Sequence, residues 1–253
     1  MRYCSLPFKH LTAAIFFSLA VVIAPLHAQV TMAQPSQAVD LIHLNYLPSD
    51  KPDAIALLPP PPLLGSPEQA AELNEVRAVY HAATSNEIAA AYSEKSFSIF
   101  NFAPAVGDYF QPGKLPRTAA FFAKVQKDAA AVTDHAKNFY QRPRPFMTDS
   151  SLENGTLEKS FSYPSGHSTE STVLALVLAD LFPDRQDAIL AVSRSIGWHR
   201  IQTARHYPTD IFAGRVLARA IVREMKKNPD FQKGFAEAKA ELDLAQKAVG
   251  VSH

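Results

Sequence analysis

The sequence of 253 residues contains a single cysteine, Cys4, and no long hydrophobic run beyond its first 28 residues. Without a second thiol no internal disulfide can form, so the fold must depend on a hydrophobic core. About 225 residues are enough to bury one. The longest later apolar stretch, Val173 to Phe182, is interrupted by Asp180. It is too short to span a bilayer, which favours a buried helix.

The sequence also lacks an excess of charge of either sign, with 25 Lys and Arg against 24 Asp and Glu. Binding to a nucleic acid backbone relies on clustered Lys and Arg. The even balance therefore argues against nucleic acid as a partner.

The N-terminus has the pattern of a secretory signal. Arg2 and Lys9 precede an apolar run over residues 11–24, and small residues follow up to Ala28. This order predicts a signal peptide over residues 1–28, cleaved near Ala28, and hence a periplasmic or secreted bacterial protein. Cleavage also removes Cys4 and leaves 23 basic against 24 acidic residues. The alternative is a retained anchor helix, although the apolar run is short for one; we expect no stable membrane insertion.

Residues 29–67 are predicted to form an extended, proline-rich arm. The stretch Leu47 to Pro67 is dense in proline, with four prolines in a row from Pro59 to Pro62. Proline fixes φ and lacks a donor, so we expect neither helix nor central strand here. The arm should lie over the surface of a single domain at residues 68–253. The alternative is a flexible linker between domains.

From Ser66 onward the sequence predicts helices. Ser66 and Pro67 form an N-cap followed by a first-turn proline, beginning a helix that reaches about Ala83. Further helices are expected at about 85–96 with Ser85 as its cap, at 117–140, at 209–228 and at 229–249. In the helix expected at 117–140 the apolar residues recur at helical spacing (Phe121, Val125, Ala129, Val132, Ala136 and Phe139). No stretch alternates with period two for long, so we predict an all-α fold.

A first polar motif runs from Lys137 to Arg144 and ends in Arg-Pro-Arg-Pro. Lys137 and Arg144 are seven residues apart, or two helical turns, so both can face one way. A residue before proline disfavours α conformation, so the helix should end here and Arg144 should leave it in an extended segment. Arginine favours bidentate phosphate binding and lysine acts as a point charge. The alternative is a solvated basic helix end.

A second motif, Tyr163-Pro164-Ser165-Gly166-His167, comes directly before an apolar segment. We expect a turn that enters a buried helix. Free N–H groups at a helix start bind anions, Gly166 allows close approach of a phosphate, and Ser165 can add a hydroxyl donor. His167 is then placed to protonate a leaving oxygen. The alternative is a serine N-cap followed by a core histidine.

A third motif consists of Arg200, His206 and Asp210. Pro208 is typical of a first helical turn, so Asp210 can fold back onto one nitrogen of His206 and fix its tautomer. Arg200 would reach the same phosphate. The alternative is an ordinary local hydrogen bond between His206 and Asp210.

Together the three motifs supply cations, two histidines and a carboxylate, which are the groups that phosphoryl transfer through a phosphohistidine requires. A zinc site built from His199, His206 and Asp210 is the other use of these residues. The chain has no His-Glu-x-x-His sequence, and three cations in the same set oppose a metal ion and favour an oxyanion. We therefore predict no metal and no cofactor.

The pattern Lys-x6-Arg-Pro, Pro-Ser-Gly-His and Arg-x5-His-x3-Asp, at Lys137, Pro164 and Arg200, resembles the signature of the type 2 phosphatidic acid phosphatase superfamily. This superfamily includes bacterial acid phosphatases, lipid phosphatases and vanadium haloperoxidases. The size, the export signal and the residues around the motifs are most similar to class A non-specific acid phosphatases, over roughly residues 47–242. His199 departs from the pattern, which has serine there. Arg142 lies off the pattern and fits a solvated helix end better.

The resemblance implies one helical-bundle domain and a metal-independent acid phosphatase with broad specificity for small phosphate monoesters, which forms homo-oligomers and can also transfer phosphate to alcohols. It implies that His206 attacks phosphorus, that Asp210 orients it, and that His167 protonates the departing alcohol. It also implies a set of phosphate-binding residues: Lys137, Arg144, Ser165, Gly166 and Arg200.

Three other functions use the same residues. A vanadium haloperoxidase would hold vanadate on His206, but such enzymes tend to be much longer. A lipid phosphatase within the membrane would need spanning helices, although a soluble enzyme can accept lipid phosphates. A periplasmic anion-binding protein without activity would not need two histidines and an orienting carboxylate.

Overall fold

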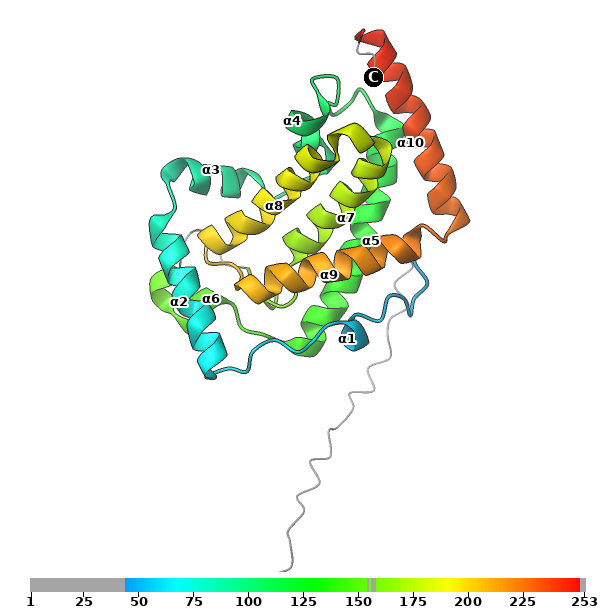
Figure 1. The fold of residues 1–253 in the computed structure, drawn as a ribbon. Coiled ribbons are helices and arrows are strands. Elements are labelled where there is room, and N and C mark those ends of the chain that lie inside the picture. The colour runs from blue at the N-terminus through cyan, green and yellow to red at the C-terminus, as the bar shows by residue number, and fades with distance from the viewer. Residues whose placement is uncertain (1–43, 154, 156–157, 251–253) are drawn as a thin grey trace, which may run out of the picture. The chain divides into compact units, whose positions relative to one another are not determined.

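The computed structural model describes residues 44–153, 155 and 158–250, and within these ranges it contains helices and no strands (Figure 1). This confirms the all-α prediction. The longer helices are α2 (Pro67–Ala82), α3 (Ser85–Ser93), α5 (Pro116–Tyr140), α7 (Gly166–Leu181), α8 (Gln186–Gln202), α9 (Pro208–Met225) and α10 (Pro229–Ala248). Short turns of helix are α1 (Ala54–Leu57), η1 (Ile99–Phe102), α4 (Ala103–Val106), α6 (Pro145–Thr148), η2 (Ser150–Leu152) and η3 (Pro183–Arg185).

Helix α7 is the centre of the bundle and packs against α5, α8 and α9. Its apolar residues are buried on all sides, as expected of a core helix. Figure 1 shows the end of α8 and the start of α9 converging at one side of the bundle, beside α2 and α3, with α10 at the opposite side along α5. This convergence brings the start of α7, the end of α8 and the start of α9 together.

The helix starts follow the capping signals with one correction. Ser66 caps α2 as predicted and accepts a hydrogen bond from the Gln69 backbone. The cap of α3 is Thr84 rather than Ser85, so that prediction was wrong by one residue. Thr84 and Glu87 form a reciprocal capping box, which satisfies two backbone N–H groups where Ser85 would satisfy one.

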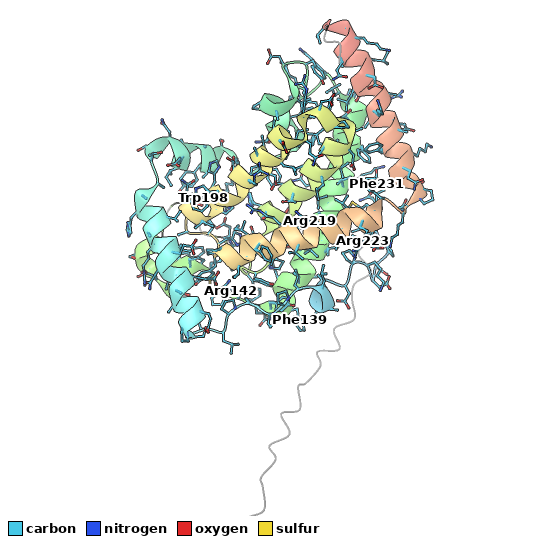
Figure 2. All side chains as sticks on the ribbon, viewed as in Figure 1. Phe139, Arg142, Trp198, Arg219, Arg223 and Phe231 are labelled. Carbon is cyan, nitrogen blue, oxygen red and sulfur yellow. The ribbon has the colours of Figure 1, made fainter. Side chains whose placement is uncertain are left out.

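Helix α5 confirms the predicted apolar stripe up to Ala136, but Phe139 is 54% exposed. At this last turn the neighbouring Tyr140 faces inward instead. Its ring packs edge-on against Tyr163 at 5.0 Å, and its hydroxyl donates to the carbonyls of Ile55 and Leu58. Figure 2 shows Phe139 on the outside of the molecule.

The described part of the proline-rich arm, from residue 44, is tied to the bundle. The Asp128 carboxylate of α5 accepts from the backbone N–H groups of Asn45 and Tyr46, and the Tyr163 hydroxyl donates to Pro59. The prediction that this segment contains no helix was wrong for one turn, α1, which Asp53 caps. The helix stops there because Pro59 follows. The predicted signal peptide and residues 29–43 of the arm lie outside the described residues.

No helix in the described part of the chain combines the length and the apolar character needed to cross a membrane. Among the same residues, His, Cys, Asp and Glu side chains form no cluster of three that could hold a metal ion.

Candidate active site

The three polar motifs meet where α5 ends and where α7 and α9 begin. Arg144 lies 3.2 Å from His206, and the Ser165 backbone donates to the Asp210 carbonyl at 3.0 Å. Every predicted site residue outside the Gly166-His167 turn is at most 5% exposed, namely Lys137, Arg144, Ser165, Arg200, His206 and Asp210. The site is therefore a buried polar cluster inside the bundle.

His206 is held in one tautomer by its two neighbours. Its Nδ1 lies 3.3 Å from a carboxylate oxygen of Asp210, and its Nε2 lies 3.2 Å from Nη1 of Arg144. A guanidinium only donates, so the lone pair is on Nε2 and the proton is on Nδ1, facing Asp210. Burial and the nearby cations, first Arg144 and then Lys137, hold the pKa of His206 well below its ordinary value. The ring is therefore neutral, with Nε2 facing the cations.

A turn at the end of α8 places His206. Ala204 adopts a left-handed conformation with φ of 53°, and the backbone N–H groups of Arg205 and His206 both donate to the Arg200 carbonyl. The chain then enters α9 at Pro208. Arg200 and His206 are thus fixed to each other through the backbone.

Asp210 is fully buried and receives donors from three segments. Besides His206, it accepts from the Tyr207 backbone at 2.9 Å, from the Ser162 hydroxyl in a short hydrogen bond, and from Arg142 at 2.6 Å. These contacts fix the Asp210 side chain beside Nδ1 of His206.

Arg142 corrects the interpretation that it is a solvated helix end. It is 4% exposed, bridges Asp210 and Glu72 of α2 at 2.6 Å each, and lies 3.8 Å above the Tyr207 ring. The cause is Gln141, whose left-handed conformation (φ 49°) ends α5 and turns the chain inward. Figure 2 shows Arg142 near α2 and the start of α9.

Lys137 and Arg144 reach the site by different routes, because α5 ends at Tyr140 and the two are not on one helical face. Arg144 is extended, as predicted, and donates to the Ser160 and Arg205 carbonyls at 2.7 and 2.8 Å. Lys137 donates to the Phe161 carbonyl at 2.6 Å. Burial, followed by Arg144, lowers the pKa of Lys137 to about 7.

The second motif forms the N-terminus of the 16-residue helix α7. Ser165 is its cap and accepts from the Ser168 backbone at 3.3 Å. A Cβ built on Gly166 would lie 3.9 Å from Cε of Lys137 and would meet nothing closer than 3.5 Å. The fold therefore tolerates a side chain there, and the space it would fill adjoins the Lys137 side chain.

His167 packs against the Phe97 ring at 5.4 Å, with its Nε2 3.2 Å from the Glu94 carbonyl. A carbonyl only accepts, so Nε2 carries the proton. Burial, and then Arg200, lowers the pKa of His167 to about 3. The ring is therefore neutral near neutral pH.

Two charged residues outside the predicted set belong to this cluster. Glu158 pairs with Arg200 and also with Arg205, whose Nε lies 3.3 Å from the carboxylate. Burial raises the pKa of Glu158, but Arg144, Arg200 and Arg205 together bring it below its ordinary value. Neither residue belongs to a motif, and the only signal in the sequence is that Arg205 directly precedes His206.

His199 faces away from the proposed zinc ligands. Its Nδ1 lies 2.8 Å from the Glu94 carboxylate at the end of α3, whereas His206 and Asp210 face each other. Glu94 also accepts from His167 through its carbonyl. His199 thus contacts the segment that positions His167.

Comparison with known proteins identifies the family of this chain. The pattern of the PAP2 superfamily matches residues 121–231. A non-specific acid phosphatase from Providencia stuartii is 31% identical over 210 residues, which cover 77% of this chain and 83% of the relative. An acid phosphatase from Zymomonas mobilis is 30% identical over 77% of each chain. A transmembrane PAP2-type phosphatidylglycerolphosphate phosphatase from Bacillus subtilis superposes with a TM-score of 0.48 at 17% identity, covering 69% of this chain and 89% of its own. The chain belongs to the PAP2 superfamily, among the non-specific acid phosphatases.

Proposed function

We propose that this protein is an exported acid phosphatase that hydrolyses phosphate monoesters through a phosphohistidine on His206. One observation carries the proposal: His206 directs an unprotonated Nε2 toward Arg144, while its Nδ1–H faces the carboxylate of Asp210. A neutral imidazole with its lone pair facing an anion-binding cluster is a nucleophile for phosphorus. The related acid phosphatases support the same reaction class.

In the first step Nε2 of His206 attacks phosphorus, and the bond from phosphorus to the ester oxygen breaks. His167 gives a proton to the departing alkoxide, which leaves as an alcohol. The non-bridging oxygens are held by the cations and by the start of α7, namely Lys137, Arg144, Arg200, Ser165 and the Gly166 N–H. Catalysis of phosphoryl transfer is mostly positioning and charge stabilisation, which this buried cluster supplies.

In the second step His167, now neutral, takes a proton from water, and the resulting hydroxide attacks phosphorus. The bond to Nε2 breaks, and inorganic phosphate leaves. Asp210 stabilises the positive ring of phosphorylated His206 throughout. An alcohol in place of water would yield a new ester, so phosphotransfer is a natural side reaction.

The protonation of His167 sets the acid dependence. With a pKa of about 3 it carries no extra proton in the free enzyme at neutral pH. A phosphate dianion offsets the field of Arg200, and the imidazolium becomes accessible in mildly acidic solution. Because Nε2–H is bound to Glu94, Nδ1 is the nitrogen available for transfer.

The first test is hydrolysis of p-nitrophenyl phosphate by the mature protein from acid to neutral pH, with and without EDTA. We expect EDTA-resistant turnover that His206→Ala abolishes and His135→Ala leaves intact, because His135 is an exposed histidine on α5. Turnover lost to EDTA, or retained in His206→Ala, would refute a metal-free histidine mechanism.

A second measurement addresses the intermediate. Added methanol should divide the product between phosphate and methyl phosphate in one ratio for esters with different leaving groups, because all pass through the same phosphoenzyme. A ratio that changes with the leaving group would indicate direct attack by water. Gel filtration of the same protein tests the expected homo-oligomer.

A further inference from the structure

Arg205 is a buried cation for which the proposed mechanism has no role. Its side chain is 3% exposed, and its guanidinium carbon lies 5.3 Å from the centre of the Phe146 ring. It directly precedes His206, and the left-handed turn at Ala204 sets both in place. A charge removed from water to this extent requires an anion nearby.

That anion is the carboxylate of Glu158. One oxygen accepts from Nη2 of Arg200 and the other lies 3.3 Å from Nε of Arg205, so the carboxylate bridges the two guanidinium groups. The Glu158 side chain is 32% exposed, whereas those of the two arginines are 6% and 3% exposed. The arginines are therefore fixed in the protein and their anion lies at the solvent side.

A pocket opens from this bridge to the surface. It is bounded by Arg200, Thr203, Arg205 and Glu158 and by residues at the end of α3, which are Ala91, Tyr92 and Lys95. Nε2 of His206 lies deeper, beside Arg144. Arg200 belongs both to this pocket and to the proposed phosphate-binding set, so the leaving group of an ester bound there can extend outward past Arg205 and Lys95.

Charge balance then points to the substrate. A phosphate dianion held by Arg144 and Arg200 would compete with Glu158 for Arg200, and Arg205 lines the pocket on the side of the leaving group. Lys95 adds another cation on the same path. A leaving group with its own negative charge compensates these cations, whereas a neutral one does not.

We propose that Arg205, assisted by Lys95, binds a second anionic group on the leaving-group side of the substrate, at the place that the Glu158 carboxylate occupies. The preferred substrates are then phosphate esters that carry a carboxylate or a second phosphate near the ester oxygen. This inference rests on the phosphatase activity proposed above and adds the class of leaving group.

The test compares phenyl phosphate with 3-carboxyphenyl phosphate, which differ by one carboxylate. We expect wild-type kcat/KM to favour the carboxylated ester by about tenfold or more, the effect of one charge-assisted hydrogen bond. Arg205→Gln should lose most of this preference, and Arg205→Lys should retain part of it. The matched control is Lys159→Gln, which removes an exposed cation beside Glu158 without altering the pocket lining and should keep the preference.

Glu158→Gln provides an independent readout. If the carboxylate stands in for a substrate anion, its removal should lower KM for both esters and increase the preference for the carboxylated one. The subsite would be refuted if Arg205→Gln kept the wild-type preference for the carboxylated ester. It would also be refuted if Glu158→Gln lost as much activity as Arg205→Gln, because the ion pair would then have a structural role. Failure of wild type to hydrolyse phenyl phosphate would instead refute the phosphatase proposal. Thermal unfolding of each variant separates misfolding from both results.

Discussion

At the residue scale, the chemistry of the site depends on how Asp210 is surrounded. Asp210 accepts from Ser162, Tyr207 and Arg142 in addition to facing His206. These donors fix the Asp210 side chain, which faces Nδ1 of His206 and keeps the proton of the ring there. Arg142 forms an ion pair with Asp210 at 2.6 Å.

Arg142→Gln should therefore harm both stability and catalysis. The substitution leaves the buried Asp210 and the partly buried Glu72 without their shared cation, and breaking such a pair costs about 3–5 kcal/mol in the free energy of unfolding. The value of kcat/KM should also fall, because Asp210 loses a donor that holds it beside Nδ1 of His206. Urea unfolding and steady-state kinetics measure the two effects.

The control for this prediction is Arg223→Gln on α9, where the side chain is 69% exposed and 3.6 Å from Glu224. Such a surface pair contributes about 0–1 kcal/mol. A purely structural Arg142 would lower stability without lowering kcat/KM of the folded protein, and that outcome would contradict its role through Asp210.

Gly166→Ala should affect activity and leave the fold intact. A Cβ at this position would meet no atom closer than 3.5 Å, and alanine is favoured over glycine in a helix by up to about 1 kcal/mol. The methyl group would, however, occupy space beside Lys137 where phosphate is proposed to bind. We expect unchanged or higher thermal stability and at least tenfold weaker inhibition by inorganic phosphate. Full phosphate affinity would show that phosphate does not approach Gly166.

The residues of the site differ in how far the sequence could predict them. Lys137, His167 and His206 each occur in a short motif, and local turn and helix signals place each motif near the end or the start of a helix. Arg142 and Glu158 depend on partners more than 40 residues away, Glu72 and Arg205 respectively. No local pattern encodes such a pairing, and the sequence alone favoured a solvated Arg142.

At the element scale, the position of the turn proposed to bind phosphate, Ser165 to His167, depends on how closely α9 approaches the start of α7. Gly214 allows the contact, because a Cβ there would lie 2.9 Å from the Ser165 carbonyl and 3.0 Å from the Thr169 nitrogen. These are backbone atoms of the turn that carries Gly166 and His167. This close contact at Gly214 therefore positions the two helices and the turn from Ser165 to His167.

Gly214→Ala should consequently reduce stability and activity together. The added methyl group must push α7 and α9 apart, and overpacking of this kind costs about 1–3 kcal/mol, more than the gain in helix propensity. Gly166→Ala is the matched comparison, since it adds the same methyl group at the start of α7 without a clash. Calorimetry and kcat/KM on both variants check the contrast; a Gly214→Ala protein as stable as wild type would show that the helices can separate freely.

Element boundaries followed from the sequence where a cap or proline marked them, as at Ser66 for α2 and Pro229 for α10. Helix α8 carries no such signal. Its N-cap, Arg185, makes no side-chain hydrogen bond and is preceded by a 3-10 turn, so the sequence analysis did not assign this helix. The chain nevertheless uses α8 to position Arg200, because its buried face packs against α7.

At the scale of the whole molecule, the buried cations and neutral histidines make the empty site unfavourable in acid. Lys137, Arg144 and Arg200 are enclosed together. Burial, and then the field of Arg144 and Arg200, lowers the pKa values of His167 and His206. An unfolded chain imposes no such field, so its histidines take up protons near pH 6.5. Acid therefore favours unfolding of the free protein, while a bound phosphate anion offsets the cations that cause the effect.

The stability of the free protein should fall as pH drops below about 6.5, where unfolded histidine gains a proton and folded His167, with a pKa of about 3, does not. Because the pKa of His167 is lower in the folded protein than in the unfolded chain, its contribution to stability is fully present above the pKa of the unfolded chain. This contribution is lost as the pH falls toward the pKa of the folded protein. Each such histidine adds a slope of up to about 1.4 kcal/mol per pH unit. Calorimetry between pH 7.5 and 4.5 should show a smaller slope in His167→Gln than in wild type, and a smaller slope for wild type with saturating phosphate. Parallel slopes with and without phosphate would mean that the anion does not bind among these cations.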